Sequence, residues 1–210
     1  MKSARLLVVT AVAAERQAIE RGLGTADGVQ VIDGGVGVAS AAAATMAVLA
    51  RQSFDAVICA GIGGGFGLDA PGLALGTASI AADLGADSPE GFVSLDQLGF
   101  GPSTMECDAA LTAELHALLP DAVPGSVLTV TTVTGTAERA QWLRQRHPDA
   151  VAEAMEGFGV ATAAARAGVP FAEVRTVSNP VGPRDRTAWR IADALAALEP
   201  VGAALATLKP

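Results

Sequence analysis

Residues 149–182 read DAVAEAMEGFGVATAAARAGVPFAEVRTVSNPVG and contain a complete strand–helix–strand pattern. An apolar segment turns at Glu156 into an Ala-rich stretch of helical composition that runs to Gly168. A second apolar run with β-branched residues follows and ends in the polar turn Asn179-Pro180. A helix between two strands is typical of α/β proteins, in which it connects parallel neighbours of one sheet.

The remainder of the chain repeats this alternation on both sides of the segment. The predicted strands outside 149–182 are 5–11, 29–33, the apolar start of 54–67, 76–87 and 126–135, and the predicted helices are 13–23, 38–52, 108–119, 137–146 and 187–208. This order predicts a three-layer α/β/α sandwich with a largely parallel, mixed central sheet, in one domain that spans residues 1–210.

Three segments carry more specific expectations. The strand that begins near Phe54 is expected to run into a glycine-rich loop at 61–65. Residues 84–105 are rich in Gly, Pro, Ser and Asp, so we expect a long irregular loop. The final helical region is expected to be interrupted near Pro200.

Composition excludes several functional classes. The net charge is -8, and Lys occurs only at positions 2 and 209. An acidic chain without a basic run is a poor ligand for nucleic acid or for an anionic membrane. No apolar run approaches the roughly 18 residues that a membrane span requires. Two Cys and two His residues, none of them clustered, predict no metal site.

The first apolar run, LLVVTAVA at 6–13, is open to two interpretations. It follows two basic residues and resembles a secretory leader, but its apolar core is at the short limit of the roughly 7–15 residues expected of one. As a strand it would deliver Glu15 to the edge of the sheet. We interpret it as a strand and predict a cytoplasmic protein.

Polar side chains follow three of the predicted strands. They are Glu15, the pair Met155-Glu156 and the pair Ser178-Asn179. Ligands of open α/β sheets bind at the carboxyl ends of the strands, which makes these residues candidates for one site. Each also has a simpler explanation, because acidic residues favour helix N-termini and Asn-Pro favours turns.

The glycine-rich segments do not form a cofactor motif. The segment at 35–40 has Ser40, and the segment at 61–66 has Phe66, where a dinucleotide fingerprint requires its third glycine. We therefore expect no cofactor, and an NAD-dependent enzyme is disfavoured. Gly61 and Gly63 either permit tight turns or bring exposed backbone groups to a ligand pocket, and the residues alone do not decide between these.

Four motifs in the correct order resemble the nucleoside phosphorylase and nucleosidase superfamily. They are TAVAAERQAI, GGVGVASAAAAT, the glycine run within DAVICAGIGGGFGLDAPGLALGT, and the segment from Met155-Glu156 to RTVSN at 175–179. Together they cover nearly the whole chain. The resemblance implies the fold predicted above and cleavage of the N-ribosidic bond of a purine nucleoside.

The resemblance also implies roles for the candidate residues. Glu15 would activate a water molecule, Glu156 would accept hydrogen bonds from the ribose hydroxyls, and Met155 would pack against the sugar. Asn179 stands where adenine-specific relatives usually have Asp. Its amide can donate to O6 and accept from N7–H of a 6-oxopurine such as hypoxanthine, whereas adenine presents a donor at position 6. Ser178 is expected to bind substrate beside it.

The tail SNPVGPRDRTAWRIADAL resembles one branch of this superfamily, whose substrate carries a carboxylate on the 5′ side of the ribose. An arginine suits a carboxylate, so Arg184 is expected to pair with it, with Arg186 as the alternative, and Trp189 to border the attached ring. Glu138 stands where relatives have a base-stacking aromatic residue, which leaves Phe158 or Phe100 as substitutes. Ala154 replaces a second glutamate.

Water rather than phosphate is the expected nucleophile, because the 61–65 glycine run lacks a hydroxyl and Glu15 would repel an anion. The expected partner is a small-molecule nucleoside, and the resemblance implies a homo-oligomer with 84–105 as the contact segment. Three alternatives stay open: a purine nucleoside phosphorylase, a nucleosidase for another 5′ group, and a non-catalytic nucleotide-binding domain.

Overall fold

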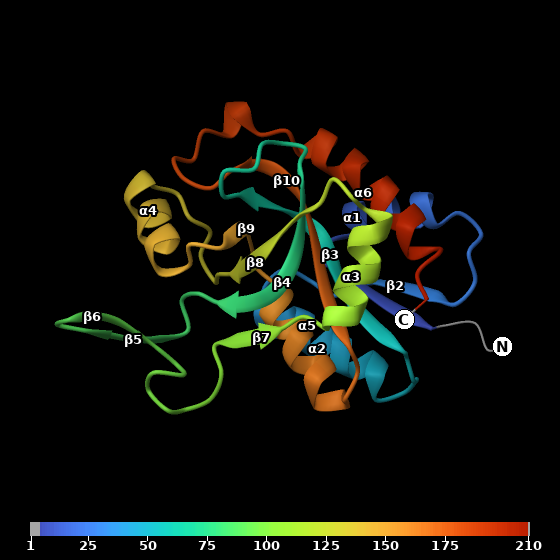
Figure 1. The fold of residues 1–210 in the computed structure, drawn as a ribbon, viewed down its shortest axis with the longest axis horizontal. Coiled ribbons are helices and arrows are strands. Elements are labelled where there is room, and N and C mark those ends of the chain that lie inside the picture. The colour runs from blue at the N-terminus through green and yellow to red at the C-terminus, as the bar shows by residue number, and fades with distance from the viewer. Residues whose placement is uncertain (1–4, 210) are drawn as a thin grey trace.

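The computed structural model describes residues 5–209, so the ends of the predicted 1–210 domain lie outside it. Helices and strands alternate along most of this length (Figure 1). In chain order they are β1 (Leu6–Thr10), α1 (Ala13–Leu23), β2 (Val29–Asp33), α2 (Val38–Leu49), β3 (Ala56–Gly65), β4 (Leu73–Ala81), β5 (Gly85–Ser88), β6 (Gly91–Ser94), β7 (Thr104–Glu106), α3 (Ala109–Leu118), β8 (Val123–Thr129), α4 (Ala137–Arg146), β9 (Ala150–Ala154), α5 (Gly157–Ala167), β10 (Phe171–Pro180), the 3₁₀ turn η1 (Arg186–Ala188) and α6 (Ile191–Leu205).

The main sheet is mixed, and part of it closes on itself. β1 pairs in parallel with β2 and β3, and β10 pairs in parallel with β3 and antiparallel with β4. β4 then pairs with β8, β8 with β9, and β9 returns to β3. These pairings bring the ends of β3, β9 and β10 together at one place in the molecule.

Helices cover both faces of this sheet, which confirms the predicted three-layer fold (Figure 1). Alternate residues of β1 face opposite layers, as the two-residue period of a strand requires. Leu6 and Val8 pack into a core with α1, α3 and α6, whereas Leu7 and Val9 pack into a core with α2 and α5. β1 is therefore buried on both faces, which explains its uninterrupted apolar sequence.

The glycine-rich segment at 61–65 is not a loop, contrary to the expectation. It is the second half of β3 and pairs with β10 along its whole length. None of these glycines has a positive φ angle, so tight turning does not explain them. Close approach does: a Cβ on Gly63 would lie 2.7 Å from the Glu153 carbonyl oxygen.

The segment 84–105 is also more regular than predicted. β5 and β6 form an antiparallel hairpin that projects from the body of the molecule, and β7 pairs with the edge of β4 (Figure 1). The hairpin is held at its base by Phe92, whose ring meets Trp142 of α4 edge to face. Its short polar strands lack the apolar alternation by which a sequence identifies a strand.

The C-terminal helix α6 continues through Pro200, where an interruption was predicted. It packs closely on α1 through two glycines. A Cβ added to Gly22 would collide with the carbonyl oxygen of Glu199, and one added to Gly202 would collide with the carbonyl oxygen of Ile19. The small residues therefore set the distance between the two helices.

We expect Gly202→Ala to lower the free energy of unfolding by about 1–3 kcal/mol, because the added methyl group forces α6 away from α1. The loss is expected despite the better helix propensity of alanine. Urea denaturation followed by circular dichroism measures it. The control is Ala203→Ser, at an exposed position of the same helix, which should change stability by about 0.5 kcal/mol or less. Equal stability of Gly202→Ala and the parent would contradict the close packing.

Across residues 5–209, no helix combines the length and the apolar character needed to cross a bilayer.

Candidate active site

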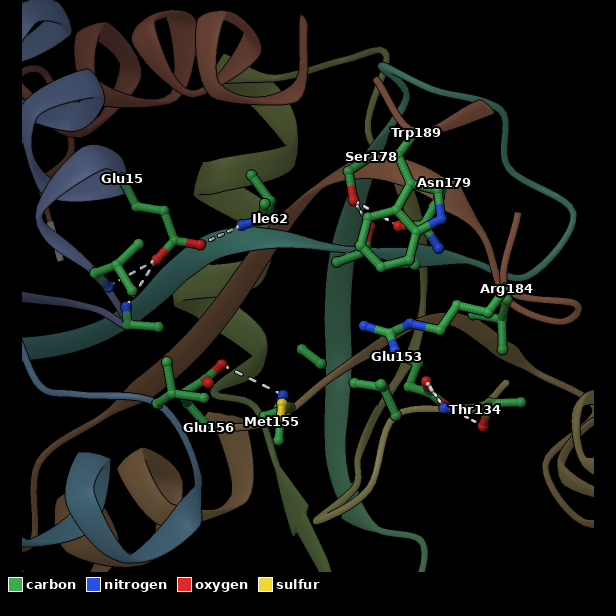
Figure 2. Close-up of a pocket in the computed structure, with 18 residues that line it drawn as sticks. Glu15, Ile62, Thr134, Glu153, Met155, Glu156, Ser178, Asn179, Arg184 and Trp189 are labelled. Carbon is green, nitrogen blue, oxygen red and sulfur yellow. Dashed lines mark hydrogen bonds between the residues drawn. The ribbon is translucent and has the colours of Figure 1, made fainter. Parts of the chain in front are cut away.

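A cavity of about 270 Å³ opens where the ends of β3, β9 and β10 meet the start of α1. Figure 2 shows the side chains that enter it. Leaving aside the alternatives Arg186, Phe158 and Phe100, all but one of the candidate residues from the sequence line this cavity, namely Glu15, Gly63, Met155, Glu156, Ser178, Asn179, Arg184 and Trp189. The exception is Gly61, which packs against Glu15 and Arg175 and does not line the cavity.

Glu15 is held by backbone hydrogen bonds from two strand ends. Its Oε2 accepts from the amides of Ala11 and Val12 at 2.8 and 3.2 Å, and its Oε1 accepts from the Ile62 amide at 2.8 Å. The residue is only 2% exposed. Three fixed donors complement a negative carboxylate and leave one acceptor position free, on Oε1.

Glu156 lies across the cavity from Glu15 (Figure 2). Its Oε1 accepts from the Gly37 amide at 3.2 Å, and its Oε2 accepts from the Met155 amide and from Arg175 Nη1, both at 3.3 Å. These contacts are long for hydrogen bonds to a carboxylate. A donor from a ligand can therefore still bind Glu156 strongly.

Arg175 is a buried cation beneath both carboxylates. Its Nε pairs with Glu173 at 2.9 Å and its Nη2 donates to Cys59 Sγ at 3.0 Å. Burial alone would lower the pKa of Arg175, but the negative groups around it, including Glu173, Glu156 and Glu15, raise it above its ordinary value. The guanidinium therefore stays charged and stabilises the carboxylates of Glu15 and Glu156, which would otherwise repel each other.

Gly61 explains how this arrangement fits together. A Cβ at this position would lie 2.7 Å from Glu15 Oε1 and 2.9 Å from Arg175 Nη1. Gly61 thus leaves room for the charged groups and does not present backbone to the cavity itself. Gly63 and the neighbouring Gly64 do line it.

Ser178 and Asn179 form a small hydrogen-bonded unit at the end of β10. Asn179 Oδ1 accepts from Ser178 Oγ at 2.8 Å, and Asn179 Nδ2 donates to the Pro180 carbonyl at 2.9 Å. The Pro180 carbonyl oxygen can only accept a hydrogen bond, so the NH2 group of the Asn179 side chain must lie on that side. The amide is therefore fixed in one orientation, with one N–H and one lone pair left for a ligand.

Glu153 is a third buried acidic residue of the lining, and it was not predicted from the sequence. It is 6% exposed, and both of its oxygens accept hydrogen bonds from Thr134, one from the backbone amide at 2.8 Å and one from the hydroxyl. Burial raises the pKa of Glu153, while the bonds from Thr134 oppose that rise.

Arg184 and Trp189 reach the cavity from the segment that connects β10 to α6. The Arg184 guanidinium lies 5.5 Å from the centre of the Trp189 ring and extends into the pocket (Figure 2). Arg186 lies 5.9 Å from the same ring but does not line the cavity. Neither Phe158 nor Phe100 lines it either: Phe158 is buried, with its backbone amide bonded to Thr129 Oγ1, and Phe100 is 79% exposed.

Three charged residues in or beneath the site were not predicted from the sequence, namely Arg175, Glu173 and Glu153. A usable signal existed for the first two, because Glu173 and Arg175 stand two residues apart in an otherwise apolar strand and so share one face. Buried charges of opposite sign on one face predict an ion pair. Glu153 had no such signal, since nothing in the sequence shows that Thr134 lies beside it.

Comparison with known proteins gives consistent matches. Residues 9–208 match the phosphorylase superfamily. The chain is 51% identical to the futalosine hydrolase of Streptomyces coelicolor, over 92% of this chain and 91% of that protein. It is 47% identical to the futalosine hydrolase of Acidothermus cellulolyticus, over 97% of this chain and 91% of that one.

Solved structures share the fold at lower identity. The S-adenosylhomocysteine nucleosidase of Streptococcus pyogenes, in complex with 5-methylthiotubericidin, matches with a TM-score of 0.86 and 18% identity, over 100% of this chain and 99% of that one. The futalosine hydrolase of Helicobacter pylori matches with a TM-score of 0.83 and 16% identity, over 98% of both chains.

Proposed function

The chain belongs to the phosphorylase superfamily and, within it, to the futalosine hydrolases, and we propose that it hydrolyses the N-ribosidic bond of futalosine. The products are hypoxanthine and dehypoxanthine futalosine, an intermediate of the futalosine route to menaquinone. The observation that carries the proposal is the convergence of Glu15, Glu156 and Asn179 on one cavity. Each of these side chains suits a different part of the reaction.

Glu15 acts on the nucleophile. N-ribosides cleave through a centre with oxocarbenium character, which water then attacks. A general base must lie within hydrogen-bonding reach of that water. Glu15 is fixed by three backbone amides, lines the cavity and keeps one lone pair free on Oε1, which supports its role as the base that accepts the proton from water.

Glu156 acts on the sugar. Its carboxylate accepts hydrogen bonds from the ribose hydroxyls, and its negative charge favours the positive charge that develops on the ring. Met155 precedes it and packs against the sugar. The buried Arg175 holds Glu156 in place from below without pairing ideally with it, at 3.3 Å.

Asn179 acts on the leaving base. Its fixed amide has one N–H for O6 and one lone pair for the N7–H that forms when N7 takes a proton from solvent as the bond to ribose breaks. Ser178 holds the amide from the other side. This arrangement suits hypoxanthine better than adenine, whose amino group at position 6 would face the Asn179 N–H.

Water is favoured over phosphate by the charges of the site. An anion in the position of the attacking water would meet Glu15 and Glu156. Arg175 is the cation nearest to both, but it is engaged by Glu156, Glu173 and Cys59. The reaction is therefore hydrolysis and not phosphorolysis.

Arg184 and Trp189 bind the 5′ substituent. The guanidinium of Arg184 pairs with the carboxylate of futalosine, and the ring of Trp189 borders the aromatic part of the same group. Of the two neighbouring arginines, Arg184 is favoured over Arg186 because only Arg184 lines the cavity.

We expect Arg184→Ala to raise KM for futalosine by about tenfold, since it removes a charge-assisted hydrogen bond at a partly solvated position. KM for inosine, which lacks the carboxylate, should change little. Steady-state kinetics with both substrates measure the difference. Arg186→Ala is the matched control and should leave both constants near those of the parent. Equal effects of Arg184→Ala on the two substrates would contradict this assignment.

The proposal also includes residues 1–210 as one catalytic domain, a homo-oligomeric form and a cytoplasmic location. The projecting β5–β6 hairpin supports an oligomer, since it extends away from the body of the molecule (Figure 1). β1 pairs on both sides within the sheet, which supports its interpretation as a strand of the fold. Light scattering on the purified protein tests the oligomeric form.

The nature of the sugar product tests the reaction type. The purified protein is incubated with futalosine in buffers with and without phosphate, and the products are identified by mass spectrometry. The expected result is hypoxanthine with dehypoxanthine futalosine in both buffers, at equal rates. A sugar phosphate, or a rate that requires phosphate, would contradict hydrolysis.

A further inference from the structure

Glu173 is a carboxylate beneath the active site to which the reaction described above gives no role. It lies in β10 and is fully buried. Its Oε1 accepts from Arg175 Nε at 2.9 Å, whereas its Oε2 accepts no hydrogen bond within residues 5–209. Apolar residues of similar volume are often as stable as a buried ion pair. Packing alone therefore does not explain why this residue is a glutamate.

Two glycines make room for the Glu173 side chain. A Cβ on Gly157 would collide with both of its carboxylate oxygens, and a Cβ on Gly76 would lie 3.1 Å from its Cβ. Gly157 is the first residue of α5, so the carboxylate lies against the end of that helix where the helix dipole favours an anion. Burial raises the pKa of Glu173, and the charge of Arg175 opposes that rise. The surroundings are thus built to accept a carboxylate.

Within residues 5–209, Arg175 has two counterions in contact, and Glu173 is the closer one. Glu173 Oε1 lies 2.9 Å from Arg175 Nε, and Glu156 Oε2 lies 3.3 Å from Arg175 Nη1. Cys59 also accepts from Arg175, but burial raises the pKa of its thiol well above the ordinary value. Cys59 is therefore neutral and balances none of the charge. If Glu173 were neutral, the balance would fall to Glu156 and the nearby Glu15.

We propose that Glu173 is a positioning residue of the reaction: it balances the charge of Arg175, so that the negative charge of Glu156 stays directed at the ribose. The inference rests on the proposed function, since it places the sugar of a nucleoside at Glu156. Without the charge of Glu173, the guanidinium would be drawn into a shorter pair with Glu156, of the kind that arginine and carboxylate usually form. That pair would occupy the carboxylate that the sugar needs.

The effect is specific to the transition state. The ribose of the bound substrate is neutral, whereas the ribose ring gains positive charge as the bond to the base breaks. Three carboxylates, Glu15, Glu156 and Glu173, surround one guanidinium, so the group as a whole is negative and favours that charge. Loss of the Glu173 charge should therefore lower kcat for futalosine and change KM little, because only the transition state is affected.

The test compares two inhibitors with the same base, which is joined to the sugar through carbon and cannot be released. One is 9-deazainosine, whose ribose is neutral. The other is its iminoribitol counterpart, in a buffer that keeps the ring nitrogen protonated and thus imitates the charged sugar. Calorimetry with the full-length protein gives the two affinities, and their ratio is the preference for the cation.

We expect Glu173→Gln to lower the preference for the cation by about tenfold, as a unit charge acting over roughly 10 Å at an effective dielectric constant of about 20 implies. Affinity for 9-deazainosine should change by about twofold or less, because that ligand carries no charge. The amide oxygen can still accept from Arg175 Nε, and the NH2 takes the place of Oε2, where it meets no hydrogen-bond donor. Circular dichroism shows whether the variant is folded.

Two further variants separate charge from support of the fold. Glu114→Gln, at an exposed position of α3, also removes one negative charge and should leave the preference unchanged, because solvent screens it. Glu173→Asp keeps the buried charge but shortens the side chain. It should retain most of the preference for the cation, and it tests the proposal even if Glu173→Gln does not fold.

Three results would overturn the proposal. If Glu173 only supports the fold, a folded Glu173→Gln variant will bind both inhibitors with the parental ratio. A tenfold loss of the preference in Glu173→Asp would show that the charge is not the cause. Equal affinity of the parent for the two inhibitors would exclude a negative site at the sugar without any variant.

Inhibitor binding also separates this inference from the proposed function. A loss of the preference in Glu173→Gln, in a protein whose parent does not turn over futalosine, would support the role of Glu173 at a ribose site and contradict the hydrolase. Futalosine turnover by the parent, with the same preference in Glu173→Gln, would support the hydrolase and contradict the role of Glu173.

Discussion

Replacing Glu15 with glutamine is expected to lower kcat for futalosine hydrolysis by about 100- to 10,000-fold, the range that general-base catalysis contributes. The amide cannot take a proton from water at neutral pH. KM should change much less, because Glu15 contacts the water and not the base or the 5′ group. Initial rates of hypoxanthine release at saturating futalosine measure the effect.

The structure also predicts a smaller effect of this substitution on stability. Glutamic acid offers two acceptor oxygens to three backbone amides, whereas glutamine offers one oxygen and an NH2. One amide, for example that of Ile62, would then face a donor, at a cost of about 1–3 kcal/mol. Thermal denaturation of the variant shows whether it is folded at the assay temperature.

Glu20→Gln is the control for this experiment. Glu20 lies on the same helix, α1, but is exposed and pairs with Arg16 at 3.5 Å. Its replacement should leave kcat unchanged. A folded Glu15→Gln variant with near-parental kcat would show that another group activates the water. A parent protein that does not turn over futalosine at all would instead favour the interpretation as a non-catalytic binding domain.

Replacing Asn179 with aspartate is expected to lower kcat/KM for futalosine by about 100-fold, as two hydrogen bonds to the base are lost or reversed. An aspartate oxygen would replace the NH2 that donates to the Pro180 carbonyl and to O6. The new oxygen and the acceptor that it faces, the Pro180 carbonyl or O6, would repel each other unless the aspartate carboxyl is protonated. A protonated aspartate can donate to N7 and tolerate an amino group at position 6.

The same variant should therefore gain activity on aminofutalosine, in which adenine replaces hypoxanthine. The ratio of kcat/KM for the two substrates is the quantity to compare. Asn179→Ala is the control, because it removes both contacts and should lower both activities without reversing the preference. An Asn179→Asp variant that keeps the parental preference would mean that Asn179 does not select the base.

The sequence was sufficient for the fold class and for the main polar residues of the cavity lining, although more than half of the lining was not predicted. Alternating apolar runs and helical segments predicted the layers, because burial of β1 on both faces requires continuous apolar residues. Glu15, Glu156 and Asn179 were found because each follows a strand, and strand ends meet at one edge of the sheet. Their convergence in the structure follows from that rule.

The remaining features depend on contacts between distant segments. The sequence left open whether Gly61 permits a tight turn or faces a ligand. In the structure it leaves space for Glu15 and Arg175, which only the tertiary structure brings together. The β5–β6 hairpin consists of short polar strands without a periodic pattern. Pro200 was expected to interrupt α6, but packing against α1 keeps the helix continuous around it.

The most direct test of the central claim is a comparison of base release by the purified parent protein. Initial rates are measured with futalosine, aminofutalosine, inosine and methylthioadenosine under the same conditions. The account predicts that futalosine has the highest kcat/KM and that hypoxanthine is its released base. A higher kcat/KM for methylthioadenosine or aminofutalosine, with release of adenine, would contradict it.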